Sequence, residues 1–186
     1  MSSLKLSTIK DLDSAIELIS TGKYVCREGK SELLSTAPSG FGNACYWMTK
    51  GLAEKVSPAP NRNVRSPVWA WGDLDYEYWK EDAGSPGEML FRIDFEIDDS
   101  RVLASDFMNW YMVLCDTPFV ETEEEMTYYE SLLKIEQERY KHKSWEKIFI
   151  IDPDSVAQYV FWELELEAVI SITPFVVPGV PMQTLN

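Results

Sequence analysis

The sequence predicts a single α+β domain with a mainly antiparallel sheet and with helices packed mostly on one side of it. Apolar and polar residues alternate, as they do in strands, over Val68–Trp71, Leu90–Ile97 and Tyr159–Ile172. Apolar residues recur instead at helical spacing over residues 12–19. We therefore expect one domain over residues 1–173, followed by an irregular tail over residues 174–186, where three prolines interrupt regular structure.

The composition is typical of a folded protein. The chain has 186 residues, of which 45% are hydrophobic, and it contains seven Trp, nine Tyr and eight Phe. This aromatic content argues against disorder, and the length suits one domain. No run approaches the ~18–20 apolar residues of a membrane span and the chain start resembles no leader, so we expect a cytoplasmic protein. Three cysteines without a CxxC pair indicate free, buried thiols rather than a zinc site.

Several helices are predicted from their first and last residues. Asp11 is placed to cap a helix that ends near Gly22 and whose apolar face consists of Leu12, Ala15, Ile16 and Ile19. A second helix is predicted over residues 43–55, after a loop of small residues over 35–42. Asp106 is placed to cap a short helix that runs through Leu114.

Charge is concentrated in the middle of the chain. The stretch from Asp73 to Glu136 contains 18 acidic residues and only four basic ones. Its net charge of −14 is therefore equal to that of the whole protein. Such a block repels nucleic acid and anionic membranes, and it attracts basic protein surfaces within about 10 Å. Part of it is predicted to form one acidic helix over Thr122–Lys143, with Glu123, Glu124 and Glu125 near its N-terminus, where the helix dipole favours them.

Aromatic residues interleave with acids in the first part of this block. The aromatic residues are Trp69, Trp71, Tyr76, Tyr78 and Trp79, and the acids are Asp73, Asp75, Glu77, Glu81 and Asp82. The acids make phosphate-bearing ligands unfavourable, whereas exposed Trp and Tyr are common anchors in protein interfaces. Core packing, a protein-binding surface and a small-ligand site all remain open for these aromatics. Together with the three glutamates near residue 124, they form the predicted partner-binding set.

The last alternating run supplies the sharpest constellation of residues with catalytic potential. Glu163, Glu165 and Glu167 would share one strand face, opposite a row of apolar residues. Such a row can act as a general base or, with Asp94 and Glu96, bind Mg²⁺ or Ca²⁺; a solvated outer sheet face is the alternative. The single histidine, His142, lies among cations and is predicted to be a surface residue. No metal site is predicted.

Several motifs, taken together, resemble the bacterial and phage family catalogued as domain-of-unknown-function family 3841. They are Tyr46-Trp47-Met48, Pro67-Val68-Trp69-Ala70-Trp71, Phe95-Glu96-Ile97, Val102-Leu103-Ala104-Ser105-Asp106-Phe107 with Trp110, Lys143-Ser144-Trp145-Glu146, and Phe161-Trp162-Glu163-Leu164 with Leu166-Glu167. The resemblance spans roughly residues 40–170 and implies no established activity. The element order is also similar to ADP-ribosyltransferase folds. That similarity implies NAD as cofactor and Glu163 or Glu165 as the catalytic acid, with Lys5 where such enzymes carry His or Arg.

The charge block favours a non-enzymatic function over a catalytic one. The leading hypothesis is an acidic protein-interaction module, an inhibitor or accessory factor of phage or bacterial origin that engages a basic, nucleic-acid-binding protein surface. It requires no cofactor, and it predicts no direct binding to nucleic acid or membrane. The alternative hypothesis is the NAD-using, ADP-ribosyltransferase-like enzyme. An aromatic surface used for self-association is a third interpretation.

Overall fold

The computed structural model describes residues 2–26, 39–61, 64, 66–72, 80, 83–151 and 154–179. The chain divides into two compact units. Unit 1 comprises Met1–Cys26, Pro67–Val102 and Tyr159–Asn186, and unit 2 comprises Arg27–Ser66 and Leu103–Gln158. The predicted α+β class and the mainly antiparallel sheet are confirmed.

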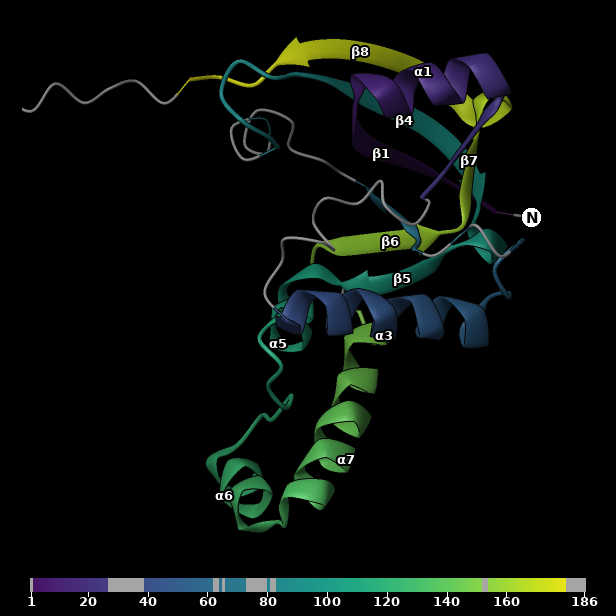
Figure 1. The fold of residues 1–186 in the computed structure, drawn as a ribbon. Coiled ribbons are helices and arrows are strands. Elements are labelled where there is room, and N and C mark those ends of the chain that lie inside the picture. Colours follow the sequence, from purple (N-terminus) through teal and green to yellow (C-terminus); the bar gives the residue numbers. More distant parts are fainter. Residues whose placement is uncertain are drawn as a thin grey trace, which may run out of the picture. The chain divides into compact units, whose positions relative to one another are not determined.

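Unit 1 is built on an antiparallel sheet (Figure 1). Its strand order is β6-β3-β1-β4-β8, and β6 runs into it from unit 2. The bounds are β1 (Ser3–Asp11), β3 (Val68–Trp71), β4 (Met89–Asp98), β6 (Ala157–Phe161) and β8 (Val169–Val176). The register sets Leu6 opposite Phe95 and Ile93 opposite Ile172. A second sheet pairs β2 (Lys23–Val25) with β7 (Glu163–Glu165), and short 3-10 turns follow β4 and β7, at η1 (Asp99–Arg101) and η3 (Leu166–Ala168).

The core of unit 1 follows the predicted alternation of β4. Ile93, Phe95 and Ile97 are buried on one face, as the sequence predicts, because residues two apart in a strand share a face. They pack with Leu6 and with other buried residues, namely Leu18, Tyr24, Val68, Ala70, Phe161 and Leu164. Burial of each such aliphatic or aromatic side chain contributes about 1.5–3 kcal/mol. The Tyr159–Ile172 run, in contrast, does not form the single predicted strand.

That run is divided among β6, β7, η3 and β8. Leu166, Glu167 and Ala168 form a 3-10 turn, and Leu, Glu and Ala are residues of good helical propensity. Strand β7 pairs with β2 instead of continuing in the main sheet, which is a tertiary choice that alternation alone does not specify. Pro174, where the irregular tail was expected to begin, lies inside β8, and residues 180–186 lie outside the described part.

Helix α1 (Leu12–Thr21) begins and ends as predicted. The Asp11 side chain accepts a hydrogen bond from the Ser14 amide at 2.7 Å, and Gly22 ends the helix with a φ of 78°, in the left-handed region that favours glycine. The burial of its apolar face is uneven, however. Of the four residues on that face only Ala15 is buried, and the other three are exposed.

Unit 2 contains helices around a second set of buried residues. Its elements are α3 (Ser39–Lys55), β5 (Leu103–Asp106), α5 (Phe107–Leu114), α6 (Glu123–Ser131), α7 (Lys134–Ser144) and η2 (Trp145–Phe149). Asp106 caps α5, as predicted, by accepting from the Asn109 amide at 2.8 Å. Helix α3 begins at Ser39, inside the expected loop, and the rest of that loop lies outside the described residues. A Cβ on Gly51 would lie 3.1 Å from the Phe149 ring, so close packing explains a glycine in this helix.

Among the residues that the structure describes, no helix has the length and apolar character needed to cross a bilayer.

Candidate interaction surface

The predicted acidic helix over Thr122–Lys143 is in fact two helices, α6 and α7. Thr122 caps α6 by accepting from the Glu125 amide at 3.1 Å. The chain is extended at Leu132 and Leu133, and α7 begins at the next residue. The Leu133 amide donates to the Glu136 carboxylate at 3.1 Å. The single-helix prediction failed because Glu136 provides a second N-terminal capping interaction inside the run. The result is a helical hairpin that carries the glutamates of the predicted partner-binding set.

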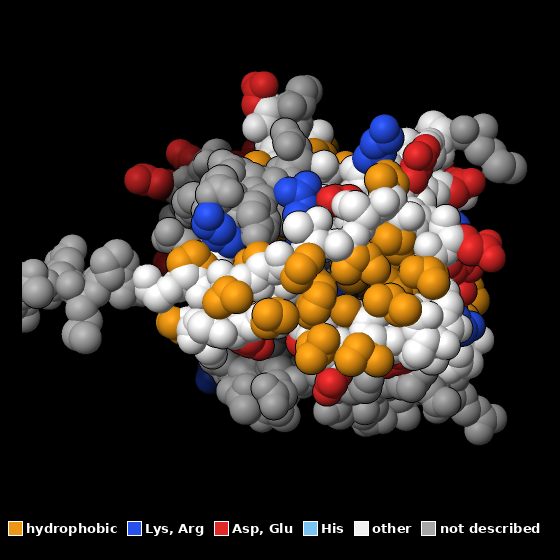
Figure 2. Space-filling model, turned by 90° about the horizontal axis from the view of Figure 1, so that it is seen from above, with side chains coloured by type: hydrophobic (Ala, Val, Ile, Leu, Met, Phe, Trp, Pro, Cys, Tyr) orange, Lys and Arg blue, Asp and Glu red, His pale blue; other side chains and the backbone are white. Residues whose placement is uncertain are grey.

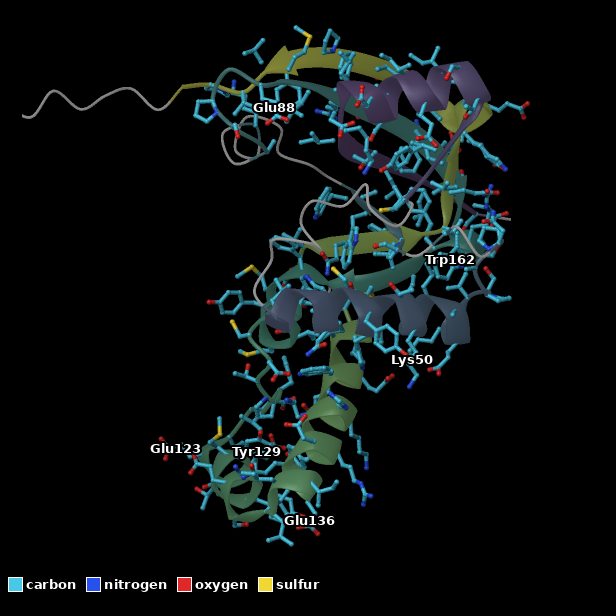
Figure 3. The ribbon with its side chains drawn as sticks, viewed as in Figure 1. Lys50, Glu88, Glu123, Tyr129, Glu136 and Trp162 are labelled. Carbon is cyan, nitrogen blue, oxygen red and sulfur yellow. The ribbon has the colours of Figure 1, made fainter. Side chains whose placement is uncertain are left out.

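Aromatic contacts hold the two helices of the hairpin together. The Tyr140 ring lies 5.9 Å from the Tyr128 ring and 5.8 Å from the Tyr129 ring, between centroids. The Gln137 side-chain amide also donates to the Tyr129 carbonyl at 3.2 Å. Figure 3 shows Tyr129 between α6 and α7 and Glu123 on the outer side of the hairpin. No residue of α6 is buried, so this helix presents most of its side chains to solvent.

The three glutamates in the first turn of α6 have different roles. Glu125 accepts from the Glu121 amide at 2.8 Å, and its neighbour Glu121 pairs with Lys147 at 3.0 Å. This hydrogen bond from Lys147 to Glu121 raises the pKa of the Lys147 amino group. Glu123 and Glu124 are exposed. The charge available to a partner at the start of α6 therefore comes mainly from these two carboxylates.

Glu123 and Glu124 border an open depression of about 450 Å³. Thr127, Tyr128 and Ser131 complete its lining, and Tyr128 is 57% exposed. The depression thus combines two carboxylates, two aliphatic hydroxyl groups and one phenol ring. This set can accept hydrogen bonds from Lys or Arg and can stack against a guanidinium group. Sequence reasoning missed Tyr128, although its spacing of four residues from Glu124 places both on one helix face.

A buried lysine near the C-terminal end of α7 connects the hairpin to the rest of unit 2. The Lys141 side chain is only 4% exposed, and its amino group pairs with Asp116 at 2.8 Å and Glu138 at 3.0 Å. Burial lowers the pKa of Lys141, but the hydrogen bonds with the two carboxylates outweigh it, so the pKa is raised above the usual value. Trp145 lies beneath this amino group, 5.7 Å away at its ring centre. These contacts hold the C-terminal end of α7 against the rest of unit 2.

The aromatic part of the predicted partner-binding set is described only at its start. Trp69 and Trp71 are half-buried residues of β3 in unit 1, and the Trp69 carbonyl accepts from Thr8 at 2.7 Å. The remaining residues of this segment lie outside the described part of the chain, namely Asp73, Asp75, Tyr76, Glu77, Tyr78, Trp79, Glu81 and Asp82.

The predicted row of three glutamates is not formed. Strand β7 ends at Glu165, and Glu167 lies in the 3-10 turn that follows. Glu163 pairs with Lys23 at 3.7 Å, and Glu165 pairs with Arg101 at 2.7 Å. Within the described ranges, no three His, Cys, Asp or Glu side chains are grouped as a metal ion would require.

Asp94, considered above as a further metal ligand, belongs to a polar cluster on the opposite face of β4 from the core. Its carboxylate accepts from Ser7 at 2.6 Å, Arg92 at 2.7 Å and Ser171 at 2.8 Å. Partial burial raises the pKa of Asp94, but these hydrogen bonds lower it more, so the pKa lies below the usual value. The cluster joins β1, β4 and β8.

We expect Asp94 to contribute to acid sensitivity. Because its folded-state pKa is depressed, its stabilising contribution is complete above the unfolded pKa of about 3.9 and is lost as the pH falls through the folded value. Urea unfolding of Asp94→Asn between pH 5 and pH 2 should show a smaller loss of stability than the wild type. The control is Asp13→Asn, at an exposed position in α1. Equal acid sensitivity of wild type and Asp94→Asn would contradict the prediction.

The remaining predicted side chains are distributed between the units. His142 is exposed, as predicted, with its ring 4.8 Å from that of Trp145. No disulfide joins the cysteines, but the expectation that all are buried is wrong, because Cys115 is exposed. Lys5 is exposed in β1.

Sequence reasoning also missed Lys10, which alternation in β1 places on the core side with Leu6. Its amino group lies 5.1 Å from the centre of the Tyr24 ring. Burial lowers the pKa of Lys10 and raises that of Tyr24 to about 12.

Comparison with known proteins identifies one family. Residues 7–170 match the family model described as domain of unknown function (DUF3841). No curated protein and no solved structure matches the chain.

Proposed function

The chain belongs to the DUF3841 family, and from this premise we propose that it is an acidic protein-interaction module, an inhibitor or accessory factor, that binds a basic protein surface. The observation that carries the proposal is the depression on α6, where exposed Glu123 and Glu124 flank exposed Tyr128. Carboxylates steer a basic partner into contact, and an exposed tyrosine supplies the apolar area that holds it.

The hairpin supports this proposal by its construction. Its inner contacts join Tyr140 to Tyr128 and Tyr129, while Tyr128 stays 57% exposed and α6 buries no side chain of its own. The helix dipole also favours carboxylates at the N-terminus of α6, so the local structure tolerates the acidic cluster without a partner. A basic surface that normally holds nucleic acid phosphates is a suitable partner, because its cations match an array of carboxylates.

We expect the double substitution Glu123→Gln and Glu124→Gln to weaken partner binding about fivefold, since exposed ion pairs contribute up to about 1 kcal/mol each and often less. The immobilised chain should capture basic proteins from lysate at about 50 mM salt and lose them at about 0.5 M, where screening shortens the Debye length. Affinity for the captured protein is then measured with each variant. Tyr128→Ala should weaken binding further, because it removes the aromatic anchor.

The matched control is Glu54→Gln with Glu167→Gln. Both of these residues are exposed and lie outside the hairpin, and the change in net charge is the same. This control should retain most of the wild-type affinity. Capture that is equally strong at both salt concentrations, and equal in the Glu123/Glu124 variant, would refute the proposal.

The NAD-using alternative stays a prediction. Its two candidate acids, Glu163 and Glu165, each pair with a cation in unit 1, which is an ordinary arrangement for surface strands. Calorimetry with NAD on the wild type and on the double Gln variant would test it.

A further inference from the structure

Helix α1 turns its most apolar side chains toward solvent. Leu12 is 48% exposed, Ile16 53% and Ile19 57%, whereas Ser14 and Glu17 on the other side are buried. The three apolar residues are spaced four and three apart, so they form one continuous stripe along the helix. Covering the exposed half of each side chain would be favourable, so the stripe is a candidate contact surface for a partner.

Strand β8, which lies on the same side of unit 1 as α1 in Figure 1, carries further exposed apolar residues. It ends the strand order on one side of the sheet, and within the described residues it is paired only with β4. Met89 and Val176 lie opposite each other and are 51% and 54% exposed. Met89 is four residues from Ile93, and Val176 is four residues from Ile172. Because strand residues an even number apart share a face, both lie on the sheet face that packs with Leu18 of α1. Ile170, in β8, is 59% exposed.

Figure 2 shows hydrophobic side chains gathered into a broad patch on the side of the molecule where α1 and β8 lie in Figure 1. The residues of this apolar face are Leu12, Ile16, Ile19, Met89, Ile170 and Val176, and all belong to unit 1.

Charge indicates which partner fits the apolar face. The chain has a net charge of −14, yet no charged residue occurs from Ala168 to its last residue, Asn186, and α1 contains no Lys or Arg. A basic partner of the kind proposed above would find no carboxylate on β8 to pair with. Two copies of the chain, in contrast, can bring their β8 strands together without opposing their carboxylates.

Within the part of the chain that the structure describes, the outer edge of β8 is also open to pairing. Natural edge strands are commonly protected by Lys, by inward-pointing charges or by proline. In β8 only Pro174 has this effect, and it leaves Val169–Thr173 without such protection. An antiparallel pair formed by one strand and its own copy satisfies twofold symmetry, which most homodimers use.

We propose that the apolar face of α1 and β8 is the interface of a homodimer, in which β8 of one copy lies antiparallel to β8 of the other. The α1 stripes lie beside the new strand pair and are covered on association. This interface and the acidic depression on α6 consist of different residues. Substitutions can therefore test the two proposals separately.

The test is sedimentation velocity of the full chain from about 1 to 100 µM, a range that reports micromolar dissociation constants. The wild type should shift from 21.4 kDa toward twice that mass as concentration rises. Ile16→Glu and Ile170→Lys should each raise the dissociation constant at least tenfold. Circular dichroism and a cooperative unfolding transition establish that both variants are folded.

The matched controls are Tyr46→Glu and Ile135→Glu, which place a charge at exposed apolar positions of unit 2 and should leave dimerisation unchanged. Dimerisation should also persist at about 0.5 M salt, because apolar association is not screened. A monomer at every concentration would overturn the proposal, and so would a dimer that neither substitution weakens. The Glu123/Glu124 variant should dimerise normally, so a failure of the partner-binding proposal is distinguishable from a failure of this one.

Discussion

Replacing Trp145 with alanine should lower the free energy of unfolding by about 3–5 kcal/mol, the usual cost of removing a large buried aromatic side chain. Trp145 is 1% exposed in unit 2. Its ring meets that of Trp47 edge to face at 5.7 Å, and its indole nitrogen donates to the Thr117 carbonyl at 2.7 Å. The substitution removes the packing, the ring contact and the hydrogen bond together. Urea unfolding monitored by circular dichroism measures the change.

Two further variants show which contact matters. Trp145→Phe keeps most of the packing but leaves the Thr117 carbonyl without its donor, so we expect a loss of about 1–3 kcal/mol, smaller than that of alanine. Tyr46→Ala removes an aromatic ring that is 73% exposed and should change stability by less than about 0.5 kcal/mol. If Trp145→Ala cost no more than Tyr46→Ala, the packing described for unit 2 would be wrong.

The second large effect is expected when Lys141 loses its carboxylates. Combining Asp116→Asn with Glu138→Gln leaves a buried cation without a counter-charge, which should cost about 3 kcal/mol, the lower end for a broken buried pair. The lower end applies because Asp116 and Glu138 are themselves 49% and 58% exposed. Asparagine suits position 116, where φ is 56°, because Asn tolerates the left-handed region.

A third substitution makes this prediction specific to charge. Adding Lys141→Met to the double variant removes the unpaired cation and should restore most of the lost stability. Since the folded-state pKa of Lys141 is raised, its contribution is complete below the unfolded value of about 10.4 and is lost as the pH rises through the folded value. The difference in the free energy of unfolding between the wild type and the double variant should therefore have its largest value at pH 7. It should decrease only in strongly alkaline solution. A difference that Lys141→Met does not reduce would contradict the prediction.

Local patterns in the sequence predicted the elements whose signals lie within a few residues. Asp11 and Asp106 cap their helices as expected, because an N-cap requires only a side-chain oxygen three residues before a free amide. The alternation in β4 correctly assigned Ile93 and Phe95 to the core. Short-range geometry is sufficient for both kinds of prediction.

The candidate site was predicted only in part. Glu123 and Glu124 were identified from charge, but the depression they border is also lined by Tyr128, which charge does not single out. The pairing of Lys141 with Asp116 joins residues 25 positions apart, and no periodicity in the sequence reports it. The predicted row of glutamates failed for a similar reason, since β7 leaves the main sheet to pair with β2.

The sequence by itself determined the α+β class, the helix caps, the core face of β4 and the acidic character of the protein, because these depend on local spacing and on composition. Only the tertiary structure decided which apolar face of α1 is buried. The periodicity of Leu12, Ile16 and Ile19 indicates a face that avoids water, but it does not say whether the chain itself provides the cover. In this protein Ala15 and Leu18 are buried, and the stripe of Leu12, Ile16 and Ile19 is left at the surface, where we propose that a second copy of the chain covers it.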